Sequence, residues 1–206
     1  MYRVDIENKR LIAVPVTTFG AQSLRERYDI QEWIADAPQI LGEELLIVAK
    51  ELVLPSGTRL DLLAVDKAGA LVVIELKRDD SGSGVEWQAI KYASYCSSFS
   101  TDEIHEYFGQ YLGQDAAHAQ TLIEDFIDTE PERLNESQRI ILVAKQFHSD
   151  VASAVLWLRD HEVDVTCVRL TPHLAKDGTL FINPDIIIPL PEARIPRNVR
   201  QDIGLL

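Results

Sequence analysis

Two short aliphatic runs joined by a polar loop dominate the hydrophobic pattern of this chain. Residues 60–65 and 71–76 are rich in Leu, Val and Ile, and the loop DKAG between them contains Gly69. Runs of this kind around a glycine-containing loop predict a β-hairpin, with Gly69 in the left-handed conformation. A three-residue loop then sets the register and pairs Asp66 with Ala70.

Polar side chains interrupt these two runs at matching positions. In this register Asp61 lies opposite Glu75, with their Cβ atoms roughly 5 Å apart. Side chains alternate along a strand, so Lys77 shares the face of Glu75. Opposed carboxylates repel each other and are costly to bury unless something positive neutralises them. Two carboxylates with a main-chain carbonyl and waters suit Mg²⁺ or Mn²⁺, and the hairpin therefore predicts a metal site.

A helix is predicted after the hairpin and a polar loop. Its apolar residues recur at helical spacing, at Val85, Ala89, Tyr92 and Cys96. Gln88 falls on the same stripe, where a buried amide is costly without a partner. We therefore expect Gln88 to face the carboxylate site.

The rest of the pattern alternates strands with helices. It predicts strands at 2–6, 10–16, 45–54, 139–145 and 163–170, and helices at 23–37, 102–112, 115–128 and 151–160. A strand, helix, strand succession implies a crossover within one sheet. The sequence thus predicts a single α/β domain over residues 1–206, a mixed central β-sheet flanked by helices. The hairpin in 1–16 would lie at a sheet edge or in a dimer contact, and the segment 171–206 would add short strands and a proline-rich arm.

The first predicted helix carries its own start and stop signals. Ser23 is the expected N-cap, Glu26 is its capping-box partner three residues later, and Pro38 marks the end. The apolar face would be formed by Ile30, Trp33, Ile34 and Ala37. Glu26 lies one turn before Ile30 and so belongs to the same face.

The order of the polar residues resembles a nuclease motif. Asp61, Glu75 after thirteen intervening residues, and Lys77 two positions later, with Gln88 on the next helix, are similar to the PD-(D/E)XK nuclease superfamily. The resemblance implies the restriction-endonuclease-like fold. Within this superfamily, the string RLDLLAVDKAGALVVIELKR resembles the catalytic domain of NucS-type endonucleases. The resemblance covers roughly residues 22–170.

The resemblance assigns a role to each of these residues. Asp61 and Glu75 would bind Mg²⁺ or Mn²⁺, and the main-chain carbonyl of Leu76 would complete the ligation. Lys77 would assist the attacking water. Gln88 would orient either Lys77 or that water.

Two further positions bear on this assignment. Folds of this kind often present a Glu from their first helix to the metal, which makes Glu26 a fifth candidate; a capping-box role for Glu26 is an equal alternative. The leading Asp of the family often follows Pro, whereas Leu60 precedes Asp61 here. That departure removes no ligand.

The implied function is metal-dependent hydrolysis of DNA phosphodiester bonds, by an endonuclease acting in DNA repair or defence. The DNA would be single-stranded, branched or mismatched, and related nucleases suggest a homodimer. A Glu-x-Lys on a strand is ordinarily a solvated surface feature. The alternative is therefore a catalytically inactive module of the same fold that binds DNA or a protein partner.

The charge of the chain limits the kind of DNA contact it can make. A net charge of −13 argues against indiscriminate nucleic-acid binding. Nine acidic residues and no Lys or Arg lie between residues 102 and 132, which places much of the excess on one segment. The residues that could line a DNA-facing side are Arg78, Lys91, Arg139, Lys145, Arg194, Arg197 and Arg200.

Other classes of protein are disfavoured by what the chain lacks. Cys96 and Cys167 lie in apolar segments, which favours free buried thiols over a disulfide or a zinc site. His105 and His118 have no ligand-like spacing and are expected at the surface. No Ser/His/Asp or Cys/His arrangement is visible. No apolar run approaches the roughly 20 residues that span a bilayer, and a cytoplasmic protein with no membrane contact is expected.

Overall fold

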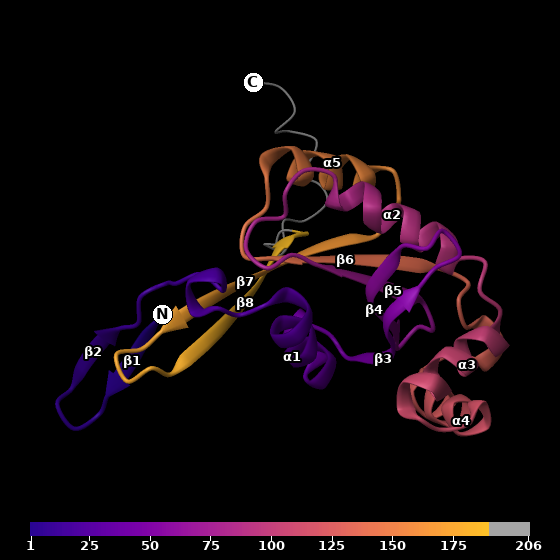
Figure 1. Ribbon diagram of the computed structural model, residues 1–206, viewed down its shortest axis with the longest axis horizontal. Helices are drawn as coiled ribbons and strands as arrows, with labels where there is room; N and C mark the ends of the chain where they lie inside the picture. The colour runs from indigo at the N-terminus through magenta and orange to yellow at the C-terminus, as the bar shows by residue number, and fades with distance from the viewer. Residues whose placement is uncertain (190–206) are drawn as a thin grey trace, which may run out of the picture.

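The central sheet contains six strands in sequence order. The computed structural model describes residues 1–189 (Figure 1). Strands β3, β4 and β5 are antiparallel neighbours, β5, β6 and β7 are parallel, and β8 returns antiparallel to β7. The strands span Leu45–Val53 (β3), Arg59–Asp66 (β4), Leu71–Leu76 (β5), Gln138–Ala144 (β6), Val165–Leu174 (β7) and Leu180–Ile188 (β8).

The predicted register of the β4–β5 hairpin is correct. Leu62 pairs with Ile74, which places Asp61 opposite Glu75 on the next rung of the ladder. Gly69 has a φ of 82°, the left-handed conformation expected of the loop. The loop length therefore brings the two carboxylates together.

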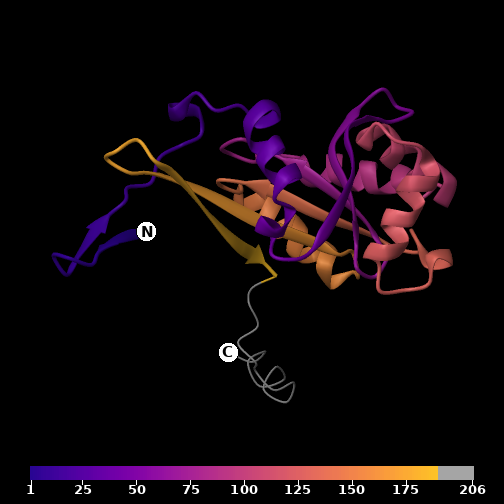
Figure 2. The same ribbon diagram turned by 90° about the horizontal axis from the view of Figure 1, so that it is seen from below.

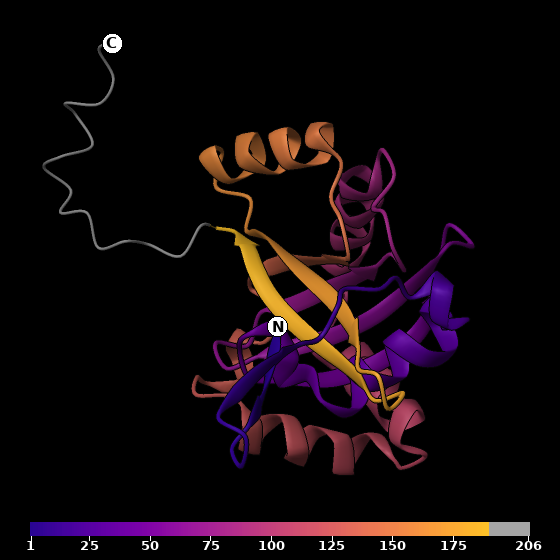
Figure 3. The same cartoon turned by 90° about the vertical axis from the view of Figure 1, so that its left-hand side faces the viewer.

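Helices cover both faces of the sheet, so the predicted fold class, a mixed α/β sheet flanked by helices, is confirmed. Helices α2 (Val85–Cys96) and α5 (Ser149–Asp160) lie over one face, and the short α1 (Gln31–Asp36) lies over the other (Figures 1 and 3). The helical pair α3 (Thr101–Leu112) and α4 (Ala116–Phe126) packs beside β3. The two faces of the sheet bury separate apolar clusters, since successive side chains point to opposite sides.

Two hairpins extend away from this body. The N-terminal one, β1 (Tyr2–Asp5) with β2 (Arg10–Ala13), forms a separate two-stranded ribbon. It lies beside the far end of the long β7–β8 hairpin (Figure 2). The two are joined by main-chain hydrogen bonds, from Thr17 N–H to the Pro172 carbonyl at 2.9 Å and from Leu174 N–H to the Pro15 carbonyl at 3.1 Å.

The start of the first helix differs from the prediction. Ser23 is not an N-cap; it has a φ of 58° at the end of a preceding 3₁₀ turn. The chain enters instead through a π-helical turn at Glu26–Ile30, which continues into α1. The capping box fails because the Glu26 carboxylate binds elsewhere, as described below. Trp33 was expected inside but is 38% exposed, whereas Ile30 and Ile34 are buried as predicted.

Several smaller expectations are also settled. Cys96 and Cys167 are free and buried, as predicted, and burial raises the pKa of each thiol to about 12. His105 was expected at the surface but is buried, because α3 turns it toward α4, and burial lowers its pKa. Within residues 1–189, no helix is both long and apolar enough to span a bilayer. The predicted arm with Arg194, Arg197 and Arg200 lies outside the described residues.

Candidate active site

Two hydrogen bonds hold Asp61 in place, one to its carboxylate and one to its main-chain carbonyl. Its Oδ2 accepts a hydrogen bond from the Leu76 N–H at 2.8 Å, across the β4–β5 ladder. Its main-chain carbonyl accepts a hydrogen bond from Gln31 Nε2 at 2.8 Å. Gln31 is buried at the start of α1, so the helix under the sheet fixes the position of this carboxylate.

Glu75 is the most deeply buried acid of the cluster. Only 1% of the residue is exposed. Its Oε1 accepts hydrogen bonds from Lys77 Nζ and from Gln88 Nε2, each at 2.7 Å. The other oxygen, Oε2, is buried and has no hydrogen-bond partner. An unpaired buried carboxylate oxygen is costly, so this atom stores unfavourable free energy that a bound cation would relieve.

Both carboxylates of this pair are hard to ionise, Glu75 the more so. Burial raises the pKa of Glu75 to about 7, and the neighbouring charge of Asp61 adds to this effect. Burial likewise raises the pKa of Asp61 to about 6, against the hydrogen bond from Leu76 N–H, which lowers it. At neutral pH this pair therefore strongly favours a proton or a cation between its members.

Lys77 remains a cation in this environment. Burial by itself would lower the pKa of its ammonium group, but the charge of Glu75 and the hydrogen bond to it outweigh burial and raise that pKa. The charges of Glu26 and Asp61 act in the same direction. A lysine held protonated supplies a fixed positive charge and does not act as a base.

Gln88 reaches the cluster from the overlying helix, as the stripe of α2 predicted. Besides Glu75, its amide nitrogen donates to the Tyr92 hydroxyl at 2.9 Å. Val85, Ala89 and Tyr92, on the same stripe, are buried against the sheet. The packing of α2 therefore points one amide into the acidic pair and fixes its orientation.

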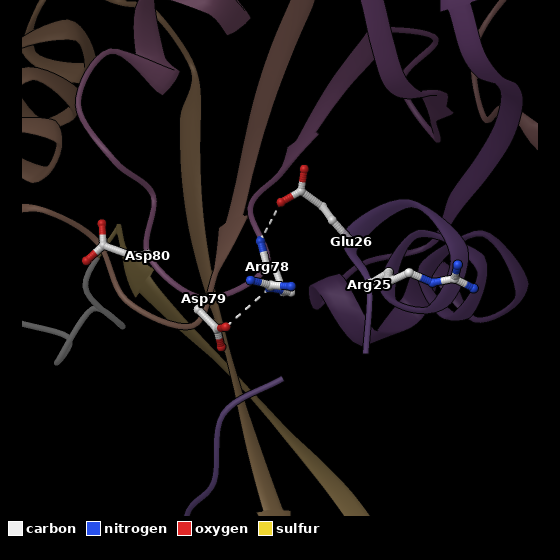
Figure 4. Close-up of a pocket in the computed structure, with 5 residues that line it drawn as sticks. All are labelled: Arg25, Glu26, Arg78, Asp79 and Asp80. Carbon is white, nitrogen blue, oxygen red and sulfur yellow. Dashed lines mark hydrogen bonds and ion pairs between the residues drawn. The ribbon is translucent and has the colours of Figure 1, made fainter. Parts of the chain in front are cut away.

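Glu26 lies at the edge of the same cluster. Its carboxylate accepts the Arg78 N–H at 2.5 Å, next to Lys77 on the chain. Its charge raises the pKa of Asp61 and of Glu75. A cavity of about 340 Å³ adjoins it, lined by Arg25, Glu26, Arg78, Asp79 and Asp80 (Figure 4). π-helical turns are frequent at functional sites, and Glu26 is the first residue of this one.

The donor set fits a hard divalent cation. Within residues 1–189, no three His, Cys, Asp or Glu side chains are already gathered as metal ligands. The chain supplies two facing carboxylates instead, one of which has a buried oxygen without a partner. Mg²⁺ is commonly held by one or two carboxylates, with waters and substrate phosphates completing its shell. The ligand roles of Asp61, Glu75 and the Leu76 carbonyl remain predictions.

Two supporting residues were not found by sequence reasoning. Gln31 positions Asp61, and Tyr92 positions Gln88, but neither belongs to the acid and base pattern. Gln31 does carry a signal, because it precedes the buried Ile34 by three positions and so lies on the inward face of α1. Tyr92 was assigned to the apolar stripe, and its hydroxyl gave no separate signal.

Arg139, a candidate for a DNA-facing side, is instead bound by carboxylates of its own chain. Its guanidinium contacts Glu43 at 2.8 Å, Asp66 at 2.7 Å and Asp164 at 3.0 Å, which ties the loop before β3 to β4 and β6. Three carboxylates occupy its donors. Of the other basic candidates in residues 1–189, Arg78 and Lys91 are exposed and Lys145 is half-buried.

Part of the chain is similar to a known protein family. The family model of the endonuclease NucS C-terminal domain matches residues 26–126, just under half of the chain. This range contains all of the clustered residues, from Glu26 to Gln88. No curated protein sequence matches the chain significantly.

Two similar solved structures have related descriptions. One is an EndoMS–dsDNA2 complex, with 19% identity and a TM-score of 0.37 over 68% of this chain and 43% of that one. The other is a repair endonuclease from Pyrococcus abyssi, with 20% identity and a TM-score of 0.34 over 66% of this chain and 43% of that one. The chain therefore spans less than half the length of these proteins.

Proposed function

We propose that this protein is a metal-dependent endonuclease that hydrolyses DNA phosphodiester bonds at the Asp61–Glu75–Lys77–Gln88 cluster. The observation that carries the proposal is the buried, unpaired Oε2 of Glu75 opposite Asp61. A scaffold gains nothing from Asp61 placed beside the buried Glu75, whose pKa it raises, whereas a cation site requires such a pair. The match to the NucS C-terminal domain supports the same reading.

Each residue has a distinct part in the proposed reaction. Asp61, Glu75 and the Leu76 carbonyl would hold Mg²⁺ or Mn²⁺, which lowers the pKa of a bound water and stabilises charge on phosphate. Lys77 places its ammonium beside Glu75, where it would stabilise negative charge developing on the phosphoryl oxygens. Gln88 keeps the Glu75 carboxylate and Lys77 in one arrangement. Glu26 fixes the chain that follows Lys77 by accepting the Arg78 N–H.

The proposed substrate is DNA that departs from a regular duplex, whether single-stranded, branched or mismatched, in repair or defence. The net charge of −13 disfavours binding to any duplex at random. A homodimer is part of the proposal.

Cleavage of labelled DNA tests this function directly. Single-stranded, duplex, mismatched and splayed DNA would be incubated with Mn²⁺ and then with Mg²⁺. We expect Lys77→Ala, Asp61→Ala and Glu75→Ala to abolish cleavage with the fold intact. Lys176→Ala, at the exposed turn between β7 and β8, is the charge-matched control and should cleave like the wild type. Full activity in any of the three site variants would refute the role of that residue.

A non-catalytic module is the second candidate function. Two observations favour it. The acidic pair α3 and α4 presents a surface suited to a basic partner, and no third ligand side chain joins Asp61 and Glu75 in the described residues. Metal binding separates the two functions. Calorimetry should show Mn²⁺ binding that Asp61→Asn removes and that Asp125→Asn, on the exposed side of α4, leaves unchanged. Absence of Asp61-dependent binding would favour the non-catalytic module.

A further inference from the structure

The N-terminal ribbon exposes an apolar face that nothing in residues 1–189 covers. Tyr2, Val4 and Leu11 share one side of β1 and β2, and with Ile6 in the turn they are between 63% and 82% exposed. The opposite side, with Arg3 and the half-buried Ile12, faces the β7–β8 hairpin. An isolated two-stranded hairpin is marginally stable in water, and pairing with further strands would stabilise the ribbon.

The main chain of β1 is also open along its outer edge. Val14 N–H donates to the Met1 carbonyl at 3.1 Å, so Met1 and Val14 form a hydrogen-bonded pair of the ribbon. These pairs alternate along an antiparallel ladder. The N–H and C=O groups of Tyr2 and Val4 therefore point away from β2, and in the described part of the chain they have no partner. An open edge of this kind is a template for another strand.

The sequence of β1 is complementary to itself about Val4. Arg3 and Asp5 flank this residue with opposite charges. In an antiparallel pair of two β1 strands related by a two-fold axis at Val4, Arg3 lies opposite the partner's Asp5, twice. The two Val4 residues then form a hydrogen-bonded pair, and the Arg3–Asp5 pairs fall at the non-hydrogen-bonded positions, where side chains approach most closely.

We propose that β1 pairs antiparallel with β1 of a second copy of this chain, centred on Val4, to form a four-stranded sheet across a two-fold axis. Charge complementarity selects a second copy as the partner, because the same short strand supplies both halves of each ion pair. The contact is small, so it gives a weak and concentration-dependent dimer. It involves no residue of the acidic cluster.

A charge-swap experiment tests the register. Sedimentation velocity over a concentration series would measure the dimer dissociation constant of the full chain with a C-terminal tag. Arg3→Asp alone or Asp5→Arg alone places like charges opposite each other twice and should raise that constant about tenfold. The double variant restores opposite charges and should recover wild-type association. Both single variants also lose a contact within the monomer, with Asp177 and Asn8 respectively, and the double variant loses both. Arg3 and Asp5 also interact within β1, and Asp5 lies opposite Arg10 in the ribbon, so circular dichroism of each variant checks that the ribbon is kept before recovery is assigned to restored pairing between copies.

A second variant tests the hydrogen-bonded edge. Val4→Pro removes an N–H that points away from β2, so the ribbon stays intact while pairing with a second copy is blocked. Circular dichroism checks that the fold is kept. A wild type that is monomeric at every concentration, a dimer that Val4→Pro leaves unchanged, or a double variant that fails to recover would each overturn the proposal. These readouts are independent of cleavage, so a failed nuclease assay does not bear on them.

Discussion

Replacing Glu75 by Gln should make the metal-free protein more stable at alkaline pH, although it destroys the proposed metal site. The substitution keeps the shape of the side chain and removes its ability to ionise. In the wild type, the carboxyl is 1% exposed and has an unpaired oxygen. Ionisation at this position is therefore opposed by burial, and the amide avoids it.

The magnitude follows from the pKa of this group. Raising the pKa of Glu75 from 4.5 to about 7 corresponds to roughly 3 kcal/mol, at about 1.4 kcal/mol per tenfold change in proton affinity. The folded carboxyl binds its proton more tightly than the unfolded one. This stability is therefore present below pH 4.5 and is lost as the pH rises through about 7.

The Glu75→Gln substitution also weakens contacts that the carboxylate makes. The pKa of about 7 already includes the opposing effect of Lys77, but the hydrogen bond from Gln88 to Oε1 loses its charged acceptor, at a cost of roughly 1–2 kcal/mol. The net gain of the variant over the wild type is then about 1–2 kcal/mol at pH 8, and it falls as the pH falls toward 4.5. Asp61 contributes in the same direction, but its charge is also one of the causes that raise the pKa of Glu75, so the two contributions overlap.

Urea unfolding in the presence of a chelator measures this difference. The free energy of unfolding of the wild type, Glu75→Gln and the surface control Glu44→Gln would be compared across this pH range; the Glu44 side chain is 74% exposed. Adding Mn²⁺ at pH 8 should stabilise the wild type by about 2.7 kcal/mol at a hundred times the dissociation constant and leave Glu75→Gln unchanged. A Glu75→Gln variant that is less stable by the same amount at every pH would refute our account of the site.

Three other substitutions test individual contacts. Gln31→Ala removes the hydrogen bond to the Asp61 carbonyl from a buried position, and we expect a loss of about 1–2 kcal/mol in urea unfolding together with weaker Mn²⁺ binding; unchanged metal affinity would contradict a positioning role. Arg139→Met leaves three carboxylates without their shared cation and should lower the free energy of unfolding by about 2–4 kcal/mol at neutral pH. In acid, where the carboxylates are protonated, the loss should be small. A loss of stability that does not depend on pH would argue against an electrostatic origin. Tyr92→Phe removes the hydroxyl that holds Gln88 and should reduce kcat with a stability change of about 1 kcal/mol or less; wild-type kcat would show that Gln88 needs no such support.

Much of the candidate site was encoded locally. The aliphatic runs and a loop of fixed length determined the hairpin register, and the register placed Asp61 opposite Glu75. The stripe of α2 placed Gln88 over them, because its helical period leaves one inward amide among apolar neighbours. These inferences succeeded because each depends on residues close in sequence or on a single ladder.

Other features required the folded chain. Ser23 and Glu26 have a capping-box spacing, yet Glu26 binds the main chain of Arg78, fifty-two residues away, and the helix begins in a different place. Arg139 was an ordinary basic residue in the sequence. Only the folded chain shows that it forms ion pairs with Glu43, in the loop before β3, and with Asp66 of β4. Secondary-structure propensity and residue spacing do not predict which residue, distant in the sequence, will bind a given side chain in the folded protein.

The sequence by itself therefore determined the α/β class, the hairpin register and the identity of the clustered acid, base and amide, since local periodicity and loop length fix all three. The tertiary structure decided the burial, the supporting contacts and the pKa values of these clustered residues. Burial under α2, support from Gln31 and the unpaired Oε2 of Glu75 depend on segments far apart in the chain. A pKa depends on solvent access and on charges brought near by folding, and that is why the chemistry of the site became visible only in three dimensions.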